Sequence, residues 1–328
     1  MKRILLCALC AVLCLSLCAG VSAATFRDIS ESPHESAILR AVREGIVTGY
    51  EDGSFRPDGK VSRAEFCAMM NRTLGITGYS VLPFRDVAVS DWFFADVRNA
   101  VTAGYIVGLP EDLFDPNGSI TRYQCALMLA RAAKYTQKST AIGYADAELI
   151  PEWAREGVAF AQESGVFSSF VTESFHGDRA MTRAETAAAL TALLDYFDKL
   201  PVFYTLVTAD EANRPVNTTT LYKNEYARLD FLVCGRELGR RYADGGLEFT
   251  ITGAIGIHTL DAAGQRTASP AYTDMQVVDD HTLHFSVTLD RADYLPAWLT
   301  ASVKLPAEGG LADAYRMHSS SVFVKYSA

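Results

Sequence analysis

The spacing of hydrophobic residues divides the chain into two parts. Up to about Lys199, apolar residues recur every three or four positions, as Ile38, Ala41 and Val42 do, which predicts amphipathic helices. From about Pro201, apolar and polar residues alternate, which is typical of half-buried strands. Seven segments indicate strands there: 202–207, 226–233, 249–252, 275–278, 282–289, 299–305 and 322–326. The second part is therefore predicted to be all-β, an antiparallel sandwich or small barrel.

The helical part contains three copies of one sequence unit. An aromatic residue followed two positions later by Asp occurs at residues 26–28, 84–86 and 144–146. A Ser/Thr-Arg-x-Glu/Gln motif occurs at residues 62–65, 121–124 and 182–185. Successive copies of both motifs lie 58 to 61 residues apart. Two independent motifs that share one period identify an internal repeat.

Each copy predicts two helices joined by a loop. The first helix ends at a glycine in the left-handed conformation: Gly45, Gly104 and Gly165. Turn-forming residues follow. The second helix begins at a capping box, whose first residues are Ser62, Thr121 and Thr182. Two short helices cannot bury their apolar faces alone, so the three units are expected to pack against one another.

Composition and charge exclude some classes of protein. The chain has 328 residues, of which 49% are hydrophobic and 21% charged, as in ordinary globular proteins. Its formal net charge of −9 argues against a nucleic-acid partner bound through a broad basic face.

The N-terminus predicts a secretory signal over residues 1–23. Lys2 and Arg3 precede an apolar run over residues 4–17, and small residues follow at 21–23. The run is too short to favour an uncleaved membrane anchor, so no membrane association is expected after cleavage. Lipoprotein processing at Cys18 is disfavoured because Leu17 is a poor small-residue match. The remaining cysteines, expected as buried thiols, are Cys67, Cys125 and Cys234.

These motifs resemble the S-layer homology (SLH) domain in its usual triplicate arrangement. The resemblance covers residues 25–198, and the segment from Gly49 to Pro57, with the sequence Gly-Tyr-Glu-Asp-Gly-Ser-Phe-Arg-Pro, carries the family pattern nearly unaltered. It implies repeats at 24–80, 81–140 and 141–200, followed by a β domain at 201–328 that resembles no family we recognise. It also implies an all-α, three-pronged pseudo-trimer of helix-loop-helix units. In this family, grooves between neighbouring copies bind the secondary cell-wall polysaccharide, often pyruvylated, without a covalent bond.

The resemblance nominates residues for polysaccharide binding: Arg63, Arg122, Arg183, Trp92, Trp153, Asp28, Asp86, Gly49 and Gly108. An arginine fork matches the carboxylate of a pyruvyl ketal, and the free N–H groups of a helix N-terminus favour an anion. An indole offers an apolar face to a sugar ring. Other roles remain open at this point: each arginine can pair with the Glu of its own capping box or a neighbouring Asp, the aspartates can be first-turn caps, and the tryptophans can be packing residues.

The copies depart from the family pattern to different extents. The first has Pro33-His34 where tryptophan is expected, and the second has Tyr123-Gln124 in place of Ala-Glu. In the third, Ser169 replaces a glycine and Gly177 replaces a proline. One or two competent grooves are therefore expected, with the third site the most doubtful.

The β part contains no catalytic motif that we recognise. His281 and His284 lie near Asp279 and Asp280, but two histidines around a turn are usually solvated. We therefore expect no catalytic residue, cofactor or metal. The sequence favours an exported, non-catalytic protein of the cell wall or S-layer, whose β domain has a structural, adhesive or ligand-binding role. Two alternatives remain: an anchored extracellular hydrolase, and an interaction module for other envelope proteins.

Overall fold

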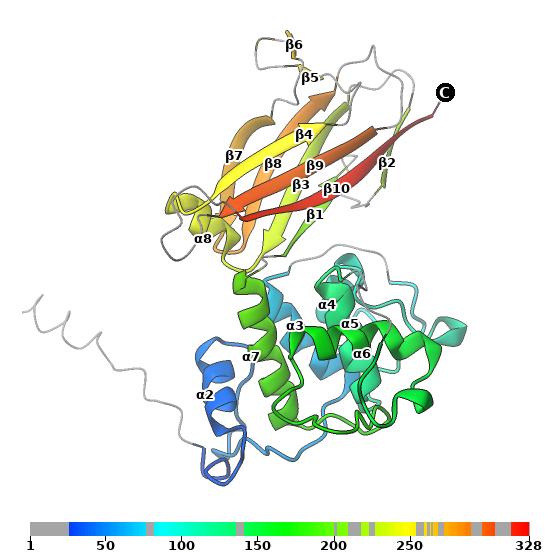
Figure 1. The fold of residues 1–328 in the computed structure, drawn as a ribbon. Coiled ribbons are helices and arrows are strands. Elements are labelled where there is room, and N and C mark those ends of the chain that lie inside the picture. Colours follow the sequence, from blue (N-terminus) through cyan, green and yellow to red (C-terminus); the bar gives the residue numbers. More distant parts are fainter. Residues whose placement is uncertain are drawn as a thin grey trace, which may run out of the picture.

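The computed structural model of the chain describes residues 26–76, 82–135, 141–199, 202–208, 218–222, 227–253, 259–260, 263, 265–267, 272–289, 297–305 and 316–327. Helices fill the first part and mainly antiparallel strands the second, as the sequence predicts (Figure 1). The predicted signal segment, residues 1–23, lies outside these residues. Within the described ranges, no helix combines the length and the apolar character needed to cross a membrane.

Each repeat contributes two α-helices. They are α2 (Glu35–Arg43) and α3 (Arg63–Leu74), α4 (Phe94–Thr102) and α5 (Arg122–Ala132), and α6 (Glu152–Ser164) and α7 (Arg183–Lys199). Two 3-10 turns, η1 (Pro110–Asp112) and η2 (Ala147–Leu149), lie in the second and third repeats. The glycines that follow the first helices have φ of 69°, 76° and 72°, as predicted.

The predicted capping boxes fix the start of each second helix. In the first repeat, Glu65 N–H donates to Ser62 Oγ at 3.2 Å, and Ser62 N–H donates to the Glu65 carboxylate at 2.8 Å. The same reciprocal pair of bonds forms between Thr121 and Gln124 and between Thr182 and Glu185. The amide at Gln124 therefore serves as well as a carboxylate in this local role.

The three repeats close into a ring. The second helix of each repeat packs against the first helix of the next: α3 on α4, α5 on α6, and α7 on α2. At the centre, Val61 N–H donates to Met181 O at 3.2 Å, and Met181 N–H donates to Ile120 O at 2.9 Å. Ile120 N–H then donates to Val61 O at 2.9 Å, which completes a three-membered cycle of hydrogen bonds. All three side chains are fully buried.

The start of each second helix also bonds to the turn of the following repeat. The N–H groups of Arg63 and Ala64 donate to Gly118 O and Pro116 O at 2.9 and 3.0 Å. The equivalent bonds run from residues 122 and 123 to residues 179 and 177, and from residues 183 and 184 to residues 59 and 57. Each repeat thus supplies backbone acceptors to the helix of its neighbour.

Two departures from the family pattern meet at one of these junctions. Tyr123 packs over Gly177, where a Cβ atom added to the glycine would lie 1.9 Å from the tyrosine ring. The Tyr123 ring stacks on Phe175 with centroids 5.6 Å apart. At the other two junctions the same positions hold an alanine and a proline: Ala64 with Pro116, and Ala184 with Pro57. A large residue facing a small one therefore replaces the Ala–Pro pair.

The β part forms two sheets. One has the order β1 (Phe203–Thr208), β3 (Ala227–Gly235), β8 (Thr282–Leu289), β5 (Thr259–Leu260) and β6 (Arg266–Thr267), and β7 (Tyr272–Asp279) also pairs with β8. The other has the order β2 (Thr218–Tyr222), β10 (Arg316–Ser327), β9 (Ala297–Leu305) and β4 (Glu248–Gly253). Alternate residues of both sheets share one core, in which Phe249 lies 5.7 Å from Phe285 between ring centroids.

The sequence prediction for this part was incomplete in three respects. Strand β2 and the short strands β5 and β6 were not predicted. Strand β2 pairs with β10 in parallel, whereas only antiparallel pairing was expected. A short helix, α8 (Leu238–Ala243), follows β3 in what was predicted to be an all-β domain. Pairing partners and a single-turn helix depend on contacts distant in sequence, which alternation cannot reveal.

The three remaining cysteines are buried, as predicted. Cys67 and Cys125 lie in the core of the helical ring, and burial raises the pKa of the Cys67 thiol to about 12. Cys234 lies on β3 and is 1% exposed. All three therefore serve as small apolar side chains.

The β part rests on the helical ring through polar contacts. The Lys134 ammonium donates to Phe203 O at 2.8 Å, and the hydroxyl of Tyr204 donates to Ala132 O. Arg236 forms an ion pair with Glu44. Strand β1 and the segment after β3 therefore bind the second and first repeats directly, beyond the covalent connection after α7.

The Tyr123–Gly177 contact predicts a compensating pair of substitutions. Tyr123→Ala removes a stacked ring and is expected to destabilise the protein by about 2–4 kcal/mol, and Gly177→Pro forces a clash that costs about 1–3 kcal/mol. The double variant recreates the Ala–Pro pair of the other junctions, where the preceding residue has the same positive φ. The double variant should therefore lose less unfolding free energy than the two single variants lose together, by at least about 1 kcal/mol. Urea unfolding of the four proteins measures this coupling, and strict additivity would contradict it.

Candidate functional site

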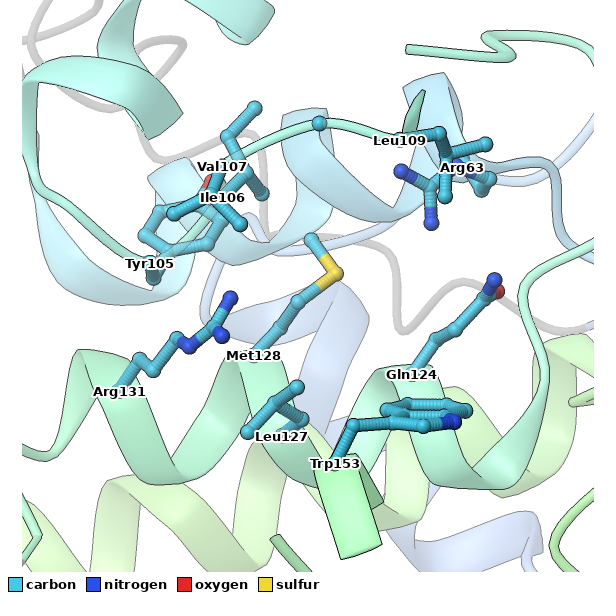
Figure 2. Close-up of a pocket in the computed structure, with 11 residues that line it drawn as sticks. Arg63, Tyr105, Ile106, Val107, Leu109, Gln124, Leu127, Met128, Arg131 and Trp153 are labelled. Carbon is cyan, nitrogen blue, oxygen red and sulfur yellow. The ribbon is translucent and has the colours of Figure 1, made fainter. Parts of the chain in front are cut away.

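Two grooves lie at equivalent junctions of the ring, each with a volume of about 270 Å³. Groove 1 is lined by Val47, Thr48, Gly49, Tyr50, Glu65, Ala68, Met69, Arg72, Trp92 and Arg183. Groove 2 is lined by Arg63, Tyr105, Ile106, Val107, Gly108, Leu109, Gln124, Leu127, Met128, Arg131 and Trp153 (Figure 2). Each groove combines the loop and second helix of one repeat with the tryptophan of the next repeat and the arginine of the preceding one around the ring.

The two tryptophans are exposed at the edges of the grooves. Trp92 is 65% exposed and Trp153 is 53% exposed. Figure 2 shows the Trp153 indole beside Gln124, at the end of groove 2 where Arg63 also lies. The indole and the Tyr123 ring are nearly perpendicular, with their centroids 5.9 Å apart. An indole held in this way leaves an apolar face free for a sugar ring.

Two of the predicted arginines are buried in the groove walls without an acidic partner. Arg63 is 5% exposed and Arg183 is 7% exposed. Arg63 Nε donates to Phe114 O at 2.8 Å, and Arg183 Nε donates to Phe55 O at 2.9 Å. Among the residues that the structure describes, neither arginine has a carboxylate oxygen within 4.0 Å. Burial lowers the pKa of the Arg63 guanidinium, and the fields of Asp115 and Asp86 oppose this shift only in part.

The third arginine is neutralised by the protein itself. Arg122 is 2% exposed, and its terminal nitrogen lies 2.7 Å from the Glu185 carboxylate, which is also buried. The Arg179 guanidinium lies 3.7 Å from the same carboxylate. His34, at the position where tryptophan was expected, packs edge-on against Phe170. At this junction the arginine therefore pairs with an acid, but the glutamate belongs to the capping box of the third repeat and not to the arginine's own box, which ends in Gln124.

The repeated aspartates bind backbone in the turns. Asp28 accepts hydrogen bonds from the N–H groups of Phe55 and Arg56 at 2.8 and 2.7 Å. Asp86 accepts from residues 114 and 115, and Asp146 from residues 175 and 176. The second residue of each pair has a φ between 50° and 58°. Asp28 and Asp86 are not among the residues lining grooves 1 and 2, and their contact with polysaccharide stays a prediction.

The two predicted glycines allow an aromatic ring to pack behind each groove. A Cβ atom on Gly49 would lie 2.1 Å from the Phe26 ring, and one on Gly108 would lie 2.3 Å from the Phe84 ring. Both glycines also line their grooves. A larger residue would therefore displace the ring that supports the groove wall.

The expectation of free N–H groups at the helix N-termini is wrong. The N–H groups of Arg63 and Ala64 bond to the next repeat, and that of Glu65 bonds to the Ser62 side chain. The same donors are used at the other two helices. Closure of the ring consumes these groups, so arginine side chains provide the local attraction for an anion.

Sequence analysis missed a second arginine in each groove. Arg72 and Arg131 follow Arg63 and Arg122 by nine residues and line grooves 1 and 2. Figure 2 shows the guanidinium groups of Arg131 and Arg63 pointing into groove 2 from opposite sides. The third copy has Ala192 at this position. The shared period of the repeat could have identified this pair.

The histidines of the β part make protein contacts. His281 Nδ1 accepts from Glu237 N–H at 3.0 Å, and both His281 and His284 are half-buried, whereas solvated side chains were expected. His284 Nε2 lies 3.4 Å from Asp230, which also accepts a hydrogen bond from Ser286 at 2.5 Å. Within the described residues, no three His, Cys, Asp or Glu side chains are grouped so that they could hold a metal ion.

Comparison with known proteins agrees with the repeat structure. A family model described as the S-layer homology domain matches residues 25–67, 83–125 and 143–187. The chain therefore carries three tandem S-layer homology domains. Proteins with these domains are anchored at the cell surface or in the S-layer, and this chain is accordingly a cell-surface protein.

Three relatives illustrate the range of proteins that share this part. An amylopullulanase of Thermoanaerobacterium thermosulfurigenes is 33% identical over 52% of this chain and 10% of its own length. A surface-layer 125 kDa protein of Lysinibacillus sphaericus is 25% identical over 54% of this chain and 15% of its own length. A cellulosome-anchoring protein of Acetivibrio thermocellus is 30% identical over 34% of this chain and 26% of its own length. The chain thus matches about a quarter or less of each relative.

The aspartates that bind the turns predict a loss of stability in acid. The hydrogen bonds from Phe55 and Arg56 outweigh partial burial and lower the pKa of Asp28 below its usual 3.8; residues 175 and 176 do the same for Asp146. Their stabilisation is therefore present above pH 3.8 and is lost as the pH falls through the lower folded-state pKa. Asp28→Asn and Asp146→Asn should each lower the free energy of unfolding by about 1–2 kcal/mol at pH 7. Each should also make that free energy depend less steeply on pH below pH 4. Urea unfolding from pH 2 to 7 tests this, with Asp58→Asn, an exposed residue of the first turn, as the control.

Proposed function

We propose that this protein is anchored non-covalently to the cell wall because grooves 1 and 2 bind an acidic secondary wall polysaccharide, while the β domain is displayed outward. The observation that carries the proposal is the repeated pairing, in both grooves, of a buried arginine without an acidic partner and an exposed tryptophan. A carboxylate such as a pyruvyl ketal would complete the ion pair that each arginine lacks.

The net charge restricts how such a ligand is bound. Loss of the predicted signal segment removes Lys2 and Arg3 from a chain of net charge −9, which leaves −11. Long-range electrostatics therefore oppose an acidic polymer. Binding then depends on short-range contacts inside the grooves, which favours recognition of a particular saccharide unit over non-specific adsorption.

Known relatives support the anchoring role. Those matched over the repeat region are named as a surface-layer protein, a cellulosome-anchoring protein and a glycan-degrading enzyme. Proteins with different activities thus share the part of the chain that forms the ring. For the β domain we propose a non-catalytic role, because its sequence contains no catalytic motif that we recognise.

The exposed tryptophans provide the first test. Trp92→Ala and Trp153→Ala should each reduce binding to purified cell walls by about 5- to 30-fold, because each removes one stacking surface worth roughly 1–2 kcal/mol. The double variant should lose retention altogether. Cosedimentation of the chain without residues 1–23 measures this, with Val89→Ala, an exposed apolar residue outside both grooves, as the control. Equal retention on walls stripped of secondary polysaccharide would overturn the proposal.

The arginines provide a second test, in which binding and stability separate. Arg63→Gln should weaken wall binding at least tenfold with a modest loss of stability, because no carboxylate among the described residues forms an ion pair with this side chain within 4.0 Å. Arg122→Gln should instead cost about 3–5 kcal/mol of stability, since it leaves Glu185 buried and without its main partner. Wall binding by this variant should be unchanged at a temperature where it is folded. Urea unfolding and cosedimentation are measured on the same samples. The reverse pattern would assign the ligand to the third junction.

A further inference from the structure

The helical ring contains one junction that the chain itself does not close. The first and second repeats follow each other along the chain, as do the second and third. The third repeat meets the first only through non-covalent contacts, with α7 packed on α2. We call this junction the seam. The hydrogen bonds from the N–H groups of Val61, Arg183 and Ala184 cross it.

The β part begins on one side of the seam and binds the other side. It follows α7 of the third repeat along the chain. The Arg236 side chain pairs with Glu44, which follows α2 of the first repeat, and both side chains are mostly buried, so salt and water screen this pair only in part. His281, between β7 and β8, lies against Gly75 at the end of α3, where a Cβ atom added to the glycine would be 2.9 Å from the imidazole ring. The β part thus holds the first repeat at two places.

Charged side chains of α2 and α7 flank the seam beside the β part. Arg40 of α2 donates two hydrogen bonds to Asp195 of α7, at 2.9 and 2.6 Å. The hydrogen bonds to Asp195 outweigh partial burial and raise the pKa of Arg40, and the fields of Glu44 and Asp198 add to this. Arg241 of α8 lies 3.7 Å from Asp198, in a more exposed and therefore weaker contact. The β part therefore adds arginines to a group of acids that lies on both sides of the seam.

Strand β1 fixes the β part on the second repeat. The Tyr204 side chain is buried and belongs to the hydrophobic core of the ring, whereas its neighbour Phe203 belongs to the core of the two sheets. The Tyr204 hydroxyl donates to Ala132 O at the end of α5, where helix carbonyl groups lack partners within the helix. Because the β part also contacts the end of α3 and continues from α7, it is attached to all three repeats.

Groove 1 spans the seam, whereas groove 2 does not. Arg183 of the third repeat lines groove 1 and donates to Thr48 O and Phe55 O of the first repeat at 2.8 and 2.9 Å. In groove 2 the equivalent residue is Arg63, which donates to Phe114 O between two repeats that the chain joins. Opening of the seam would therefore displace a wall of groove 1 and leave groove 2 intact.

We propose that the β part is a clamp that keeps the seam closed, and that groove 1 keeps its shape only while this clamp is seated on the ring. Tyr204 fixes the clamp on the second repeat, and Arg236 holds the first repeat, which chain connectivity leaves free at the seam. The two sides of the seam are then linked through the β part as well, which raises the effective concentration at which an opened seam closes again. This inference is independent of what the grooves bind.

Amide hydrogen exchange, followed by NMR in the chain without residues 1–23, tests the clamp. Each junction has equivalent reporters: Val61, Arg183 and Ala184 at the seam, Ile120, Arg63 and Ala64 between the first and second repeats, and Met181, Arg122 and Tyr123 between the second and third. Arg236→Gln should accelerate exchange about tenfold at the seam and by less than about twofold at the other two junctions. Tyr204→Phe should accelerate exchange at the seam about threefold, because it loosens the clamp on the second repeat.

The matched control is Arg240→Gln, because Arg240 also lies on α8 but pairs with Glu237 inside the β part. It should leave exchange at all three junctions unchanged. Glu44→Gln should reproduce the effect of Arg236→Gln, and combining the two should add little, because both remove the same ion pair. Urea unfolding of the same samples shows that each variant is folded.

Two results would overturn the inference while leaving the proposed function untouched. Equal acceleration at all three junctions would mean that the β part supports the fold as a whole. Unchanged exchange at the seam in both Arg236→Gln and Tyr204→Phe would mean that contacts within the ring, such as the pair of Arg40 with Asp195, hold the seam without the β part.

Discussion

Three backbone hydrogen bonds at the centre of the ring hold the rest of the structure in place. Val61, Ile120 and Met181 each donate to one neighbouring repeat and accept from the other. No repeat can therefore satisfy its own central segment, and an unpaired buried backbone group costs about as much as a lost hydrogen bond. The same junctions position the buried arginines beside the open grooves in which we propose that an acidic ligand binds. Binding geometry is thus a property of the closed ring and of no single repeat.

Local signals in the sequence predicted the elements well, because caps and turn glycines act within a few residues. The capping boxes and the three left-handed glycines are all found where the repeat places them. The sequence could not assign each arginine to a groove, since Arg63 belongs to the first repeat but lines the groove of the second. Nor could the sequence distinguish the roles of Glu65 and Glu185, which occupy the same position of the motif. Glu185 differs in that it pairs with Arg122, which lies 63 residues away along the chain.

The departures from the family pattern also have different meanings in three dimensions. Tyr123 and Gly177 seem unrelated along the chain, yet they form one packing contact in which a large and a small residue exchange places. Gln124, directly beside Tyr123, keeps its local role as a cap and changes the charge of a groove. Single positions of a repeat therefore carry separate functions, and loss of similarity at one of them does not indicate loss of the site.

The internal ion pair between Arg122 and Glu185 has a consequence for attachment. Under the proposed function, it leaves two binding grooves in place of three, both carried by one ring. A polymer held at two points detaches only when both contacts open together, and a released contact rebinds at a high effective concentration. Attachment can then last far longer than either contact alone, while each contact remains weak enough to exchange.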